Sequence, residues 1–197
     1  MNRDLALDLV RRELRESARV LGEVALGQAA FVVDAAALVE ASLRKGGTLY
    51  TCGNGGSAAD AQHIAAELSG RFYLERRGLA AVALTTNTSA ITAIANDYSY
   101  QEVFARQLEG PAKAGDVLLA ITTSGSSANV VRAVETARRL GMKVIGLTGA
   151  RGAAFAGTCD AALVVPSEDV ARIQESHIAA GHLICHLVEA AFFGDRG

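Results

Sequence analysis

The pattern of apolar positions predicts two helices followed by an alternation of strands and helices. Residues 2–24 and 28–45 carry apolar side chains at helical spacing, with charged residues between them, and the second segment ends at a glycine pair. The expected strands after this point are Thr48–Cys52, Ala80–Thr86, Asp116–Thr122, Lys143–Thr148 and Ala161–Val165. The expected helices are Ser57–Ser69, Ser89–Asn96, Ser127–Leu140, a short one at Ala153–Gly157 and a last one at Val170–Phe193.

Strands of this kind predict a parallel sheet with helices on both faces. Their apolar runs are nearly continuous, as in strands that are buried from two sides. We therefore expect one α/β domain over residues 1–197, a three-layer αβα sandwich with five parallel strands of the flavodoxin-like type. Residues 1–46 would form an N-terminal helical extension and residues 47–197 the α/β core. The amphipathic N-terminal helices would cover the sheet or meet another subunit.

Composition and charge exclude several classes of protein. The chain has 19 basic and 21 acidic residues and a formal net charge of −2, so nothing marks it for nucleic acid or an anionic membrane. Its first residues lack the apolar core of a signal peptide, and no uncharged apolar run approaches the roughly 20 residues that span a bilayer. The three cysteines are far apart, which favours free thiols in a reducing compartment. We expect a cytoplasmic protein.

The segment Gly53–Ser57 directly follows the first strand and opens a helix. Its three glycines in four residues let the backbone turn tightly and approach a ligand closely. Ser57 is expected to cap the helix, whose N-terminal amides attract anions. The spacing Gly53-x-Gly55-x-x-Ala58 also fits a loose dinucleotide fingerprint, which needs an acidic residue at the end of the second strand. Since that strand ends without one, a dinucleotide site is disfavoured, and a plain tight turn stays open.

A second unusual loop, Thr122–Ser127, follows the third expected strand. Five hydroxyl residues flank one glycine there, directly before a helix. Hydroxyls and free backbone amides can hold a phosphate monoester without lysine or arginine. A P-loop would need a lysine after the glycine, so hydrolysis of a nucleoside triphosphate is disfavoured. Taken alone, the loop could be a serine-rich capped turn. Two such loops on neighbouring strands favour a phosphate site, because ligands bind at the carboxyl ends of parallel strands.

Two helices carry groups suited to metal binding or acid–base chemistry. His63 and Glu67 are four residues apart and share a helical face. Gln174 and His182 in the last helix are eight residues apart, an offset of about 80°. Two imidazoles, a carboxylate and an amide oxygen suit a zinc-type ion. The carboxylate and an imidazole equally suit a general base and acid. Spacing alone leaves both interpretations open, and also the interpretation of these histidines as surface or interface residues.

Four segments together resemble a known family. Gly53–Glu67, Ala95–Asp97, Thr122–Ser127 and Arg172–His177, followed by His182, resemble phosphoheptose isomerases of the sugar isomerase (SIS) domain superfamily. The resemblance covers nearly the whole chain. The hydroxyl loop marks only the superfamily, whereas the helix with His63 and Glu67, joined to the last helix, is more specific. One departure is Ala171, since some relatives carry an acidic residue directly before the Arg-Ile-Gln-Glu run.

The resemblance implies an isomerase that converts sedoheptulose 7-phosphate to D-glycero-D-manno-heptose 7-phosphate, a precursor of bacterial lipopolysaccharide heptose. It also implies a cytoplasmic homotetramer with active sites at subunit interfaces and one zinc ion per subunit. The implied zinc ligands are His63, Glu67, Gln174 and His182. The implied substrate-binding positions, to which we add Ser57, are Asn54, Gly55, Gly56, Glu67, Asn96, Asp97, Thr122, Thr123, Ser124, Ser127 and Gln174.

Such a reaction removes a proton from one carbon and returns it to the neighbouring carbon through an enediol. We expect Glu67 to act as the base and His182 as the acid or proton shuttle. A metal would polarise the carbonyl, so metal binding and base catalysis compete for Glu67. Two rival functions stay open. SIS domains also serve as non-catalytic sugar-phosphate sensors, and one relative binds a replication initiator protein. The other rival is an isomerase of a pentose or hexose phosphate.

Overall fold

The computed structural model describes residues 2–194 and contains a five-stranded parallel sheet. Its strands are β1 (Leu49–Gly53), β2 (Ala81–Ala83), β3 (Val117–Ile121), β4 (Lys143–Gly149) and β5 (Ala161–Val165). They pair in the order β2-β1-β3-β4-β5. This is the flavodoxin-like order, in which the chain starts near the centre and winds to both sides. The predicted fold class is confirmed, and β1 and β3 lie side by side, so the loops that follow them are neighbours.

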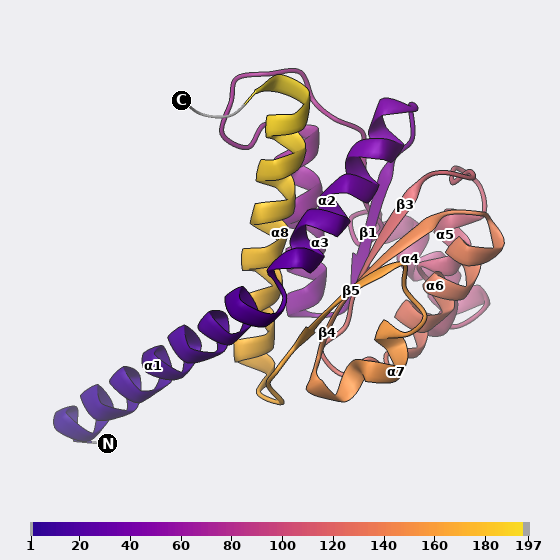
Figure 1. Cartoon of the computed structure of the whole chain (residues 1–197). Coiled ribbons are helices and arrows are strands. Elements are labelled where there is room, and N and C mark those ends of the chain that lie inside the picture. Colours follow the sequence, from indigo (N-terminus) through magenta and orange to yellow (C-terminus); the bar gives the residue numbers. More distant parts are fainter. Residues whose placement is uncertain (1, 195–197) are drawn as a thin grey trace.

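Helices cover both faces of the sheet, as Figure 1 shows. On one face α2 (Ala29–Arg44), α3 (Gly56–Ser69) and α8 (Val170–Phe193) pack together. On the other face lie α4 (Thr88–Asp97), α5 (Ala105–Leu108), α6 (Ala128–Arg139) and α7 (Ala153–Ala156). The N-terminal helix α1 (Arg3–Gly27) contacts α8 and then projects away from the body of the molecule (Figure 1). The short 3-10 turns are Tyr100–Glu102 and Ala150–Gly152.

The central strand β3 explains the continuous apolar runs of the sequence. Val117, Leu119 and Ile121 belong to the core beneath α2, α3 and α8, whereas Leu118 and Ala120 belong to the core beneath α5 and α6. All five residues are buried, since successive side chains of a strand point to opposite faces and both faces are covered.

The edge strand β2 is shorter than the sequence pattern indicates. Only Ala81–Ala83 forms a strand, whereas the apolar and threonine-rich run predicts Ala80–Thr86. Beyond Ala83 the chain turns, and the Thr86 hydroxyl donates a hydrogen bond to the Ala83 carbonyl. A strand paired on one side has fewer ladder bonds to keep it extended, so local side-chain bonds decide where it ends.

The helix α8 is long and apolar enough to cross a membrane by length and composition, although it contains Arg172, Glu175 and Glu189 and so is not an uncharged apolar run. Its buried residues include Ile173, Ala180 and Ile184, which belong to the core beneath the sheet. The apolar character of α8 is therefore accounted for by its place in one helical layer of the three-layer fold, where it contacts the sheet on one side and other helices on its flanks.

Candidate active site

The first loop joins β1 to α3 and differs from the expectation in its cap. The helix begins at Gly56, and its N-cap is Gly55, which has a φ of +55° that few other residues adopt. Ser57 lies buried in the first turn and is not the cap, so that prediction is wrong. No side chain caps this helix. Its first amides are therefore left to bind an anion.

The second loop joins β3 to α6 and presents its hydroxyls in two pairs. The Oγ atoms of Thr122 and Ser127 lie 3.1 Å apart, and those of Ser124 and Ser126 lie 2.9 Å apart. Thr122 is buried at the end of the strand, whereas Ser124 is exposed. Thr123 and Ser124 also line a small pocket of about 80 Å³ beside Arg151. The arrangement has hydroxyl groups of several orientations at the amino end of a helix, which suits a phosphate group.

The two loops are tied together by a pair of asparagines. Asn54 of the first loop and Asn129 of α6 exchange two reciprocal amide hydrogen bonds, both 2.8 Å long. The Tyr100 hydroxyl donates a third bond, 3.1 Å long, to the Asn54 oxygen. Sequence reasoning missed Asn129 and Tyr100. The position of Asn129, two residues after the hydroxyl loop, was the available signal.

Three of the four residues expected to bind metal converge between α3 and α8. The ligand atoms of His63, Glu67 and His182 all lie within 4.8 Å of one another. Nε2 of His63 is 2.9 Å from Oε1 of Glu67 and 3.3 Å from Nε2 of His182. His63 is exposed, and the other two are half-buried. Residues 119 positions apart meet here because α3 and α8 pack side by side on the same face of the sheet.

Gln174 lies at the other end of the contact between α3 and α8. A Cβ atom at Gly56 would lie 2.3 Å from Nε2 of Gln174, so the amide is seated against the first turn of α3. His63 comes seven residues after Gly56 on this helix, about 10 Å along its axis. In this structure Gln174 therefore lies beside the first loop. The two histidines and Glu67 form a separate cluster further along the helices.

Asn96 and Asp97 end α4 and are both exposed. The Asn96 amide donates a hydrogen bond of 2.9 Å to the Asp97 carboxylate. The 3-10 turn that follows carries Tyr100, whose hydroxyl reaches Asn54. This segment is thereby connected to the first loop, while its own two polar side chains face solvent.

Burial changes the acid–base chemistry of several groups near the site. It raises the pKa of Cys52, beside the first loop, and of Cys185, in α8, to about 12 each, so neither is a thiolate near neutral pH. Asp60 precedes His63 by one helical turn on α3, and burial raises the pKa of its carboxyl group. Among the described residues, its Oδ2 atom has no hydrogen-bond partner. Burial therefore disfavours Cys52 and Cys185 as nucleophiles.

The donor set of the cluster fits a metal ion such as zinc. Two imidazole nitrogens and one carboxylate oxygen are the ligands that zinc accepts, and three protein ligands leave a position open, as in catalytic zinc sites. The three side chains come from α3 and α8, and the hydrophobic core fixes the position of these two helices.

Comparison with known proteins shows the family of the chain. The sequence matches the SIS domain family over residues 14–149. A phosphoheptose isomerase from Rhodospirillum rubrum is 56% identical over 160 residues, 81% of this chain and 85% of the relative. One from Bradyrhizobium is 50% identical over 199 residues and covers 99% of both chains. The solved phosphoheptose isomerase from Neisseria gonorrhoeae has 45% identity and a TM-score of 0.89, over 94% of this chain and 99% of that one.

The fold and its two loops are those of a SIS domain. Within that class the chain belongs to the phosphoheptose isomerase family and is a sugar-phosphate isomerase.

Proposed function

We propose that this enzyme converts sedoheptulose 7-phosphate to D-glycero-D-manno-heptose 7-phosphate. The observation that carries the proposal is the gathering of His63, Glu67 and His182 within 4.8 Å, on α3, which begins at the first loop, and on α8, whose Gln174 lies against that loop. Aldose–ketose isomerisation needs a base at carbon and an acid at oxygen, and this cluster contains both kinds of group. The relatives that share this family name support a heptose as the substrate.

In this proposal Glu67 is the base. Its Oε1 contacts His63, while Oε2 has no hydrogen bond to the described residues and is available for a proton. The carboxylate takes a proton from C1 of the ketose and returns it to C2, so that the electron pair passes through an enediol. His182 moves a proton between the two oxygens as the carbonyl shifts from C2 to C1. Imidazole suits this task because it can donate a proton from one ring nitrogen and accept one at the other.

The loops would hold the phosphate. Thr122, Thr123, Ser124 and Ser127, with the amides of Gly55, Gly56 and Ser57, form the proposed anion site. Because the cluster lies about two helical turns beyond Gly56, the phosphate and the reacting carbons would be well separated. That separation favours a sugar whose phosphate is far from its carbonyl. Asn54, Asn96, Asp97 and Gln174 are proposed to contact the hydroxyl groups between them. Binding energy from the remote phosphate orients the reacting carbons.

Zinc is proposed as the cofactor, one ion per subunit. His63, Glu67 and His182 would hold it, and Gln174 completes the set only if its side chain turns away from Gly56. Bound there, the ion would polarise the sugar carbonyl as a Lewis acid. Glu67 has two carboxylate oxygens and His182 has two ring nitrogens, so each would hold the ion through one atom and keep the other for its proton-transfer role.

We further propose that the enzyme is a cytoplasmic homotetramer in an early step of bacterial lipopolysaccharide heptose synthesis. An apolar groove of about 310 Å³ lies between α1, α2 and α8, and its lining includes Val33, Leu183 and Leu187. On α1, the apolar side chains of Leu5, Val10 and Leu14 are more than half exposed. Apolar surface of this extent supports contact with further copies of the chain.

The decisive experiment is incubation with sedoheptulose 7-phosphate, with and without a chelator, followed by detection of the aldose. Formation of the aldose that stops on chelation and resumes with added zinc is expected. Absence of the aldose under all conditions contradicts the proposed substrate. Aldose formation that survives complete removal of metal contradicts the zinc proposal alone.

A non-catalytic sugar-phosphate sensor is the alternative from another class. It would need the two loops but not the cluster, and the presence of Glu67 opposite His182 favours catalysis. In the same experiment, tight binding of the sugar phosphate without turnover is the outcome that supports the alternative.

A further inference from the structure

The segment between α3 and β2 is attached to α8 by a buried ion pair. Nε of Arg76 lies 2.7 Å from Oε1 of Glu189, and the two side chains are only 1% and 2% exposed. The same carboxylate accepts backbone N–H bonds from Phe72, Tyr73 and Leu74, at 3.1, 2.8 and 3.0 Å. Four donors thus converge on one buried carboxylate, which leaves the segment little freedom to move relative to α8.

Arg76 extends this attachment to the end of α3. Its guanidinium donates to the carbonyl oxygens of Glu67, Leu68 and Gly70, at 2.8, 2.9 and 3.0 Å. Carbonyl groups in the last turn of a helix have no partner within the helix. Arg76 supplies that partner and at the same time contacts Glu189. One ion pair therefore joins the last turn of α3, which contains Glu67, to α8, which contains His182.

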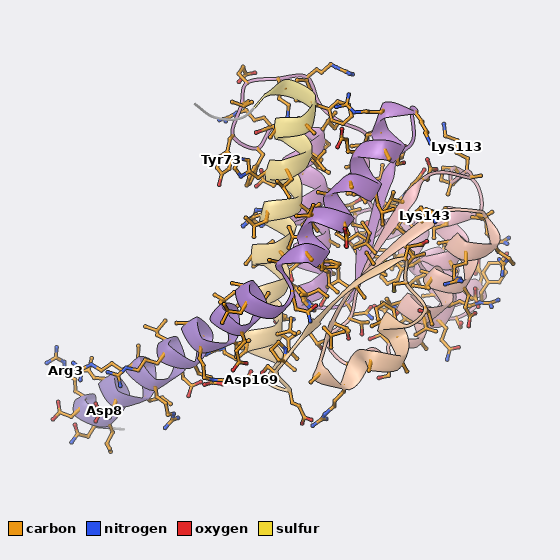
Figure 2. The ribbon with its side chains drawn as sticks, viewed as in Figure 1. Arg3, Asp8, Tyr73, Lys113, Lys143 and Asp169 are labelled. Atoms are coloured by element: carbon orange, nitrogen blue, oxygen red, sulfur yellow. The ribbon has the colours of Figure 1, made fainter. Side chains whose placement is uncertain are left out.

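Two aromatic residues of this segment, Phe72 and Tyr73, lie against histidines of α8. The ring of Phe72 stacks on the His182 imidazole, with ring centroids 5.7 Å apart and planes inclined by 25°. Tyr73 meets His186, one turn further along α8, edge to face at 5.1 Å. Figure 2 shows Tyr73 beside α8, at the other end of this helix from Asp169. The backbone bonds to Glu189 fall on the same residues, so they fix the rings where they touch the histidines.

A buried ion pair is weak evidence for stability, since apolar residues of similar volume often serve as well. Its geometry is the better guide to its role. We propose that Glu189 is a positioning residue, which holds Phe72 against His182 and keeps Glu67 and His182 facing each other. The proposal rests on the proposed role of His182 as acid. Its ring must keep one orientation during proton transfer, and a stacked aromatic ring restricts its rotation.

The test compares Glu189→Gln with the wild-type enzyme. The glutamine keeps the volume but presents an NH2 group toward backbone donors. We expect kcat to fall at least about tenfold and KM to change less than about twofold, because the phosphate loops lie at the other end of α3. The second readout is the NMR signal of the His182 ring in protein labelled at histidine. It should move toward its position in Phe72→Leu, which removes the aromatic ring current directly.

Asp116→Asn is the matched control. Asp116 is 1% exposed and accepts backbone N–H bonds from Thr48 and Lys113, at 2.9 and 2.8 Å. This variant should lower the melting temperature as Glu189→Gln does, with kcat and the His182 signal unchanged. An unmoved His182 signal with normal kcat in Glu189→Gln overturns the proposal, as does an equal loss of kcat in both variants. If Glu189→Gln does not fold, Phe72→Leu alone must show the loss of kcat.

Failure of the proposed function is distinguishable from failure of this inference. A wild-type enzyme without isomerase activity contradicts the function, while the His182 signal of the variants still reports whether Glu189 positions the ring.

Discussion

Glu67 lies at the boundary between the core and the surface of the molecule. Oε1 contacts the exposed His63, its backbone carbonyl accepts from Arg76, and Cys185 and Ile64 lie in the core behind it. The residue is half-buried, so the carboxylate is partly desolvated yet open to a ligand. The protein holds such a carboxylate in a fixed position, and a base must be positioned in this way to take a proton from carbon.

Glu67→Gln should reduce kcat by roughly 100-fold or more while KM changes little, because the amide keeps the shape and cannot accept the proton. Steady-state kinetics with sedoheptulose 7-phosphate provides the measurement. The control is Glu135→Gln, the same chemical change at an exposed position of α6. Near-normal kcat in Glu67→Gln refutes its assignment as the base.

His177 gives the stability a dependence on pH. Burial lowers its pKa to about 4 from 6.5, and the nearby Thr148 backbone opposes this only in part. The unfolded chain takes up a proton near pH 6.5, whereas the folded chain does so only near pH 4. The free energy of unfolding should therefore fall as the pH drops below 6.5, with a loss of about 2 kcal/mol at pH 5.

Urea unfolding at pH 7.5 and pH 5, at one protein concentration, measures this loss. His177→Leu removes the titrating group, so its loss between these two pH values should be smaller by about 2 kcal/mol. Equal losses in the two proteins would show that His177 does not contribute.

Single residues differ in how well the sequence predicts them. His63 and Glu67 could be paired from their spacing, because four residues separate neighbours on any helix. Their approach to His182 needed the packing of α3 on α8, which spacing does not encode, and the resemblance supplied it. Phe72 and Asn129 were missed because their roles come from contacts with distant segments. Ser57 was misassigned because a glycine at φ +55° took the cap position.

Among the elements, the hydroxyl loop is tightly constrained at its glycine. Gly125 has a φ of +71°, and a Cβ atom there would lie 2.6 Å from the Cα of Gly152. The backbones of two loops approach each other at this point, and neither can move without displacing Ser124 or the 3-10 turn that contains Arg151. The loop therefore needs glycine for two independent reasons, conformation and space.

Gly125→Ala should raise KM for the sugar phosphate by at least about tenfold, since the hydroxyls must shift to make room for the methyl group. Gly115→Ala is the control, because Gly115 also has a positive φ, +90°, but open space around it. That variant should cost only the backbone strain, about 1–2 kcal/mol of stability, and keep the normal KM. A similar KM in both variants contradicts the crowding argument.

The elements themselves were largely predictable. The ends of the interior strands, such as β3, were predicted to within one residue. A strand that is buried from both sides has an unbroken run of apolar residues, and such a run is easy to recognise. The edge strand β2 was predicted too long, and the short helix α5 and the 3-10 turn at Tyr100 were missed. Elements as short as α5 and this turn carry too few positions to show a period, so tertiary contacts decide them.

At the scale of the whole molecule, the groove between α1, α2 and α8 predicts association. Light scattering should give a mass near four chains of 20.4 kDa, about 82 kDa. Val33→Asp places a charge in the groove at a side chain that is 59% exposed, and it should produce smaller species. Ala154→Asp, at an exposed position on α7 on the opposite face of the sheet, should leave the mass unchanged. An unchanged mass in Val33→Asp excludes the groove from the contact.

The position of α8 after all five strands has a consequence for synthesis on the ribosome. Both loops and the His63–Glu67 pair emerge before β4, but His182 and the rest of α8, which covers one face of the sheet together with α2 and α3, emerge after all five strands. A nascent chain that stops after β5 would expose the apolar surface that α8 covers and would lack the imidazole partner. Isomerase activity should thus arise only once α8 has been synthesised, and chains cut short before α8 should be targets for chaperones rather than partly active enzymes.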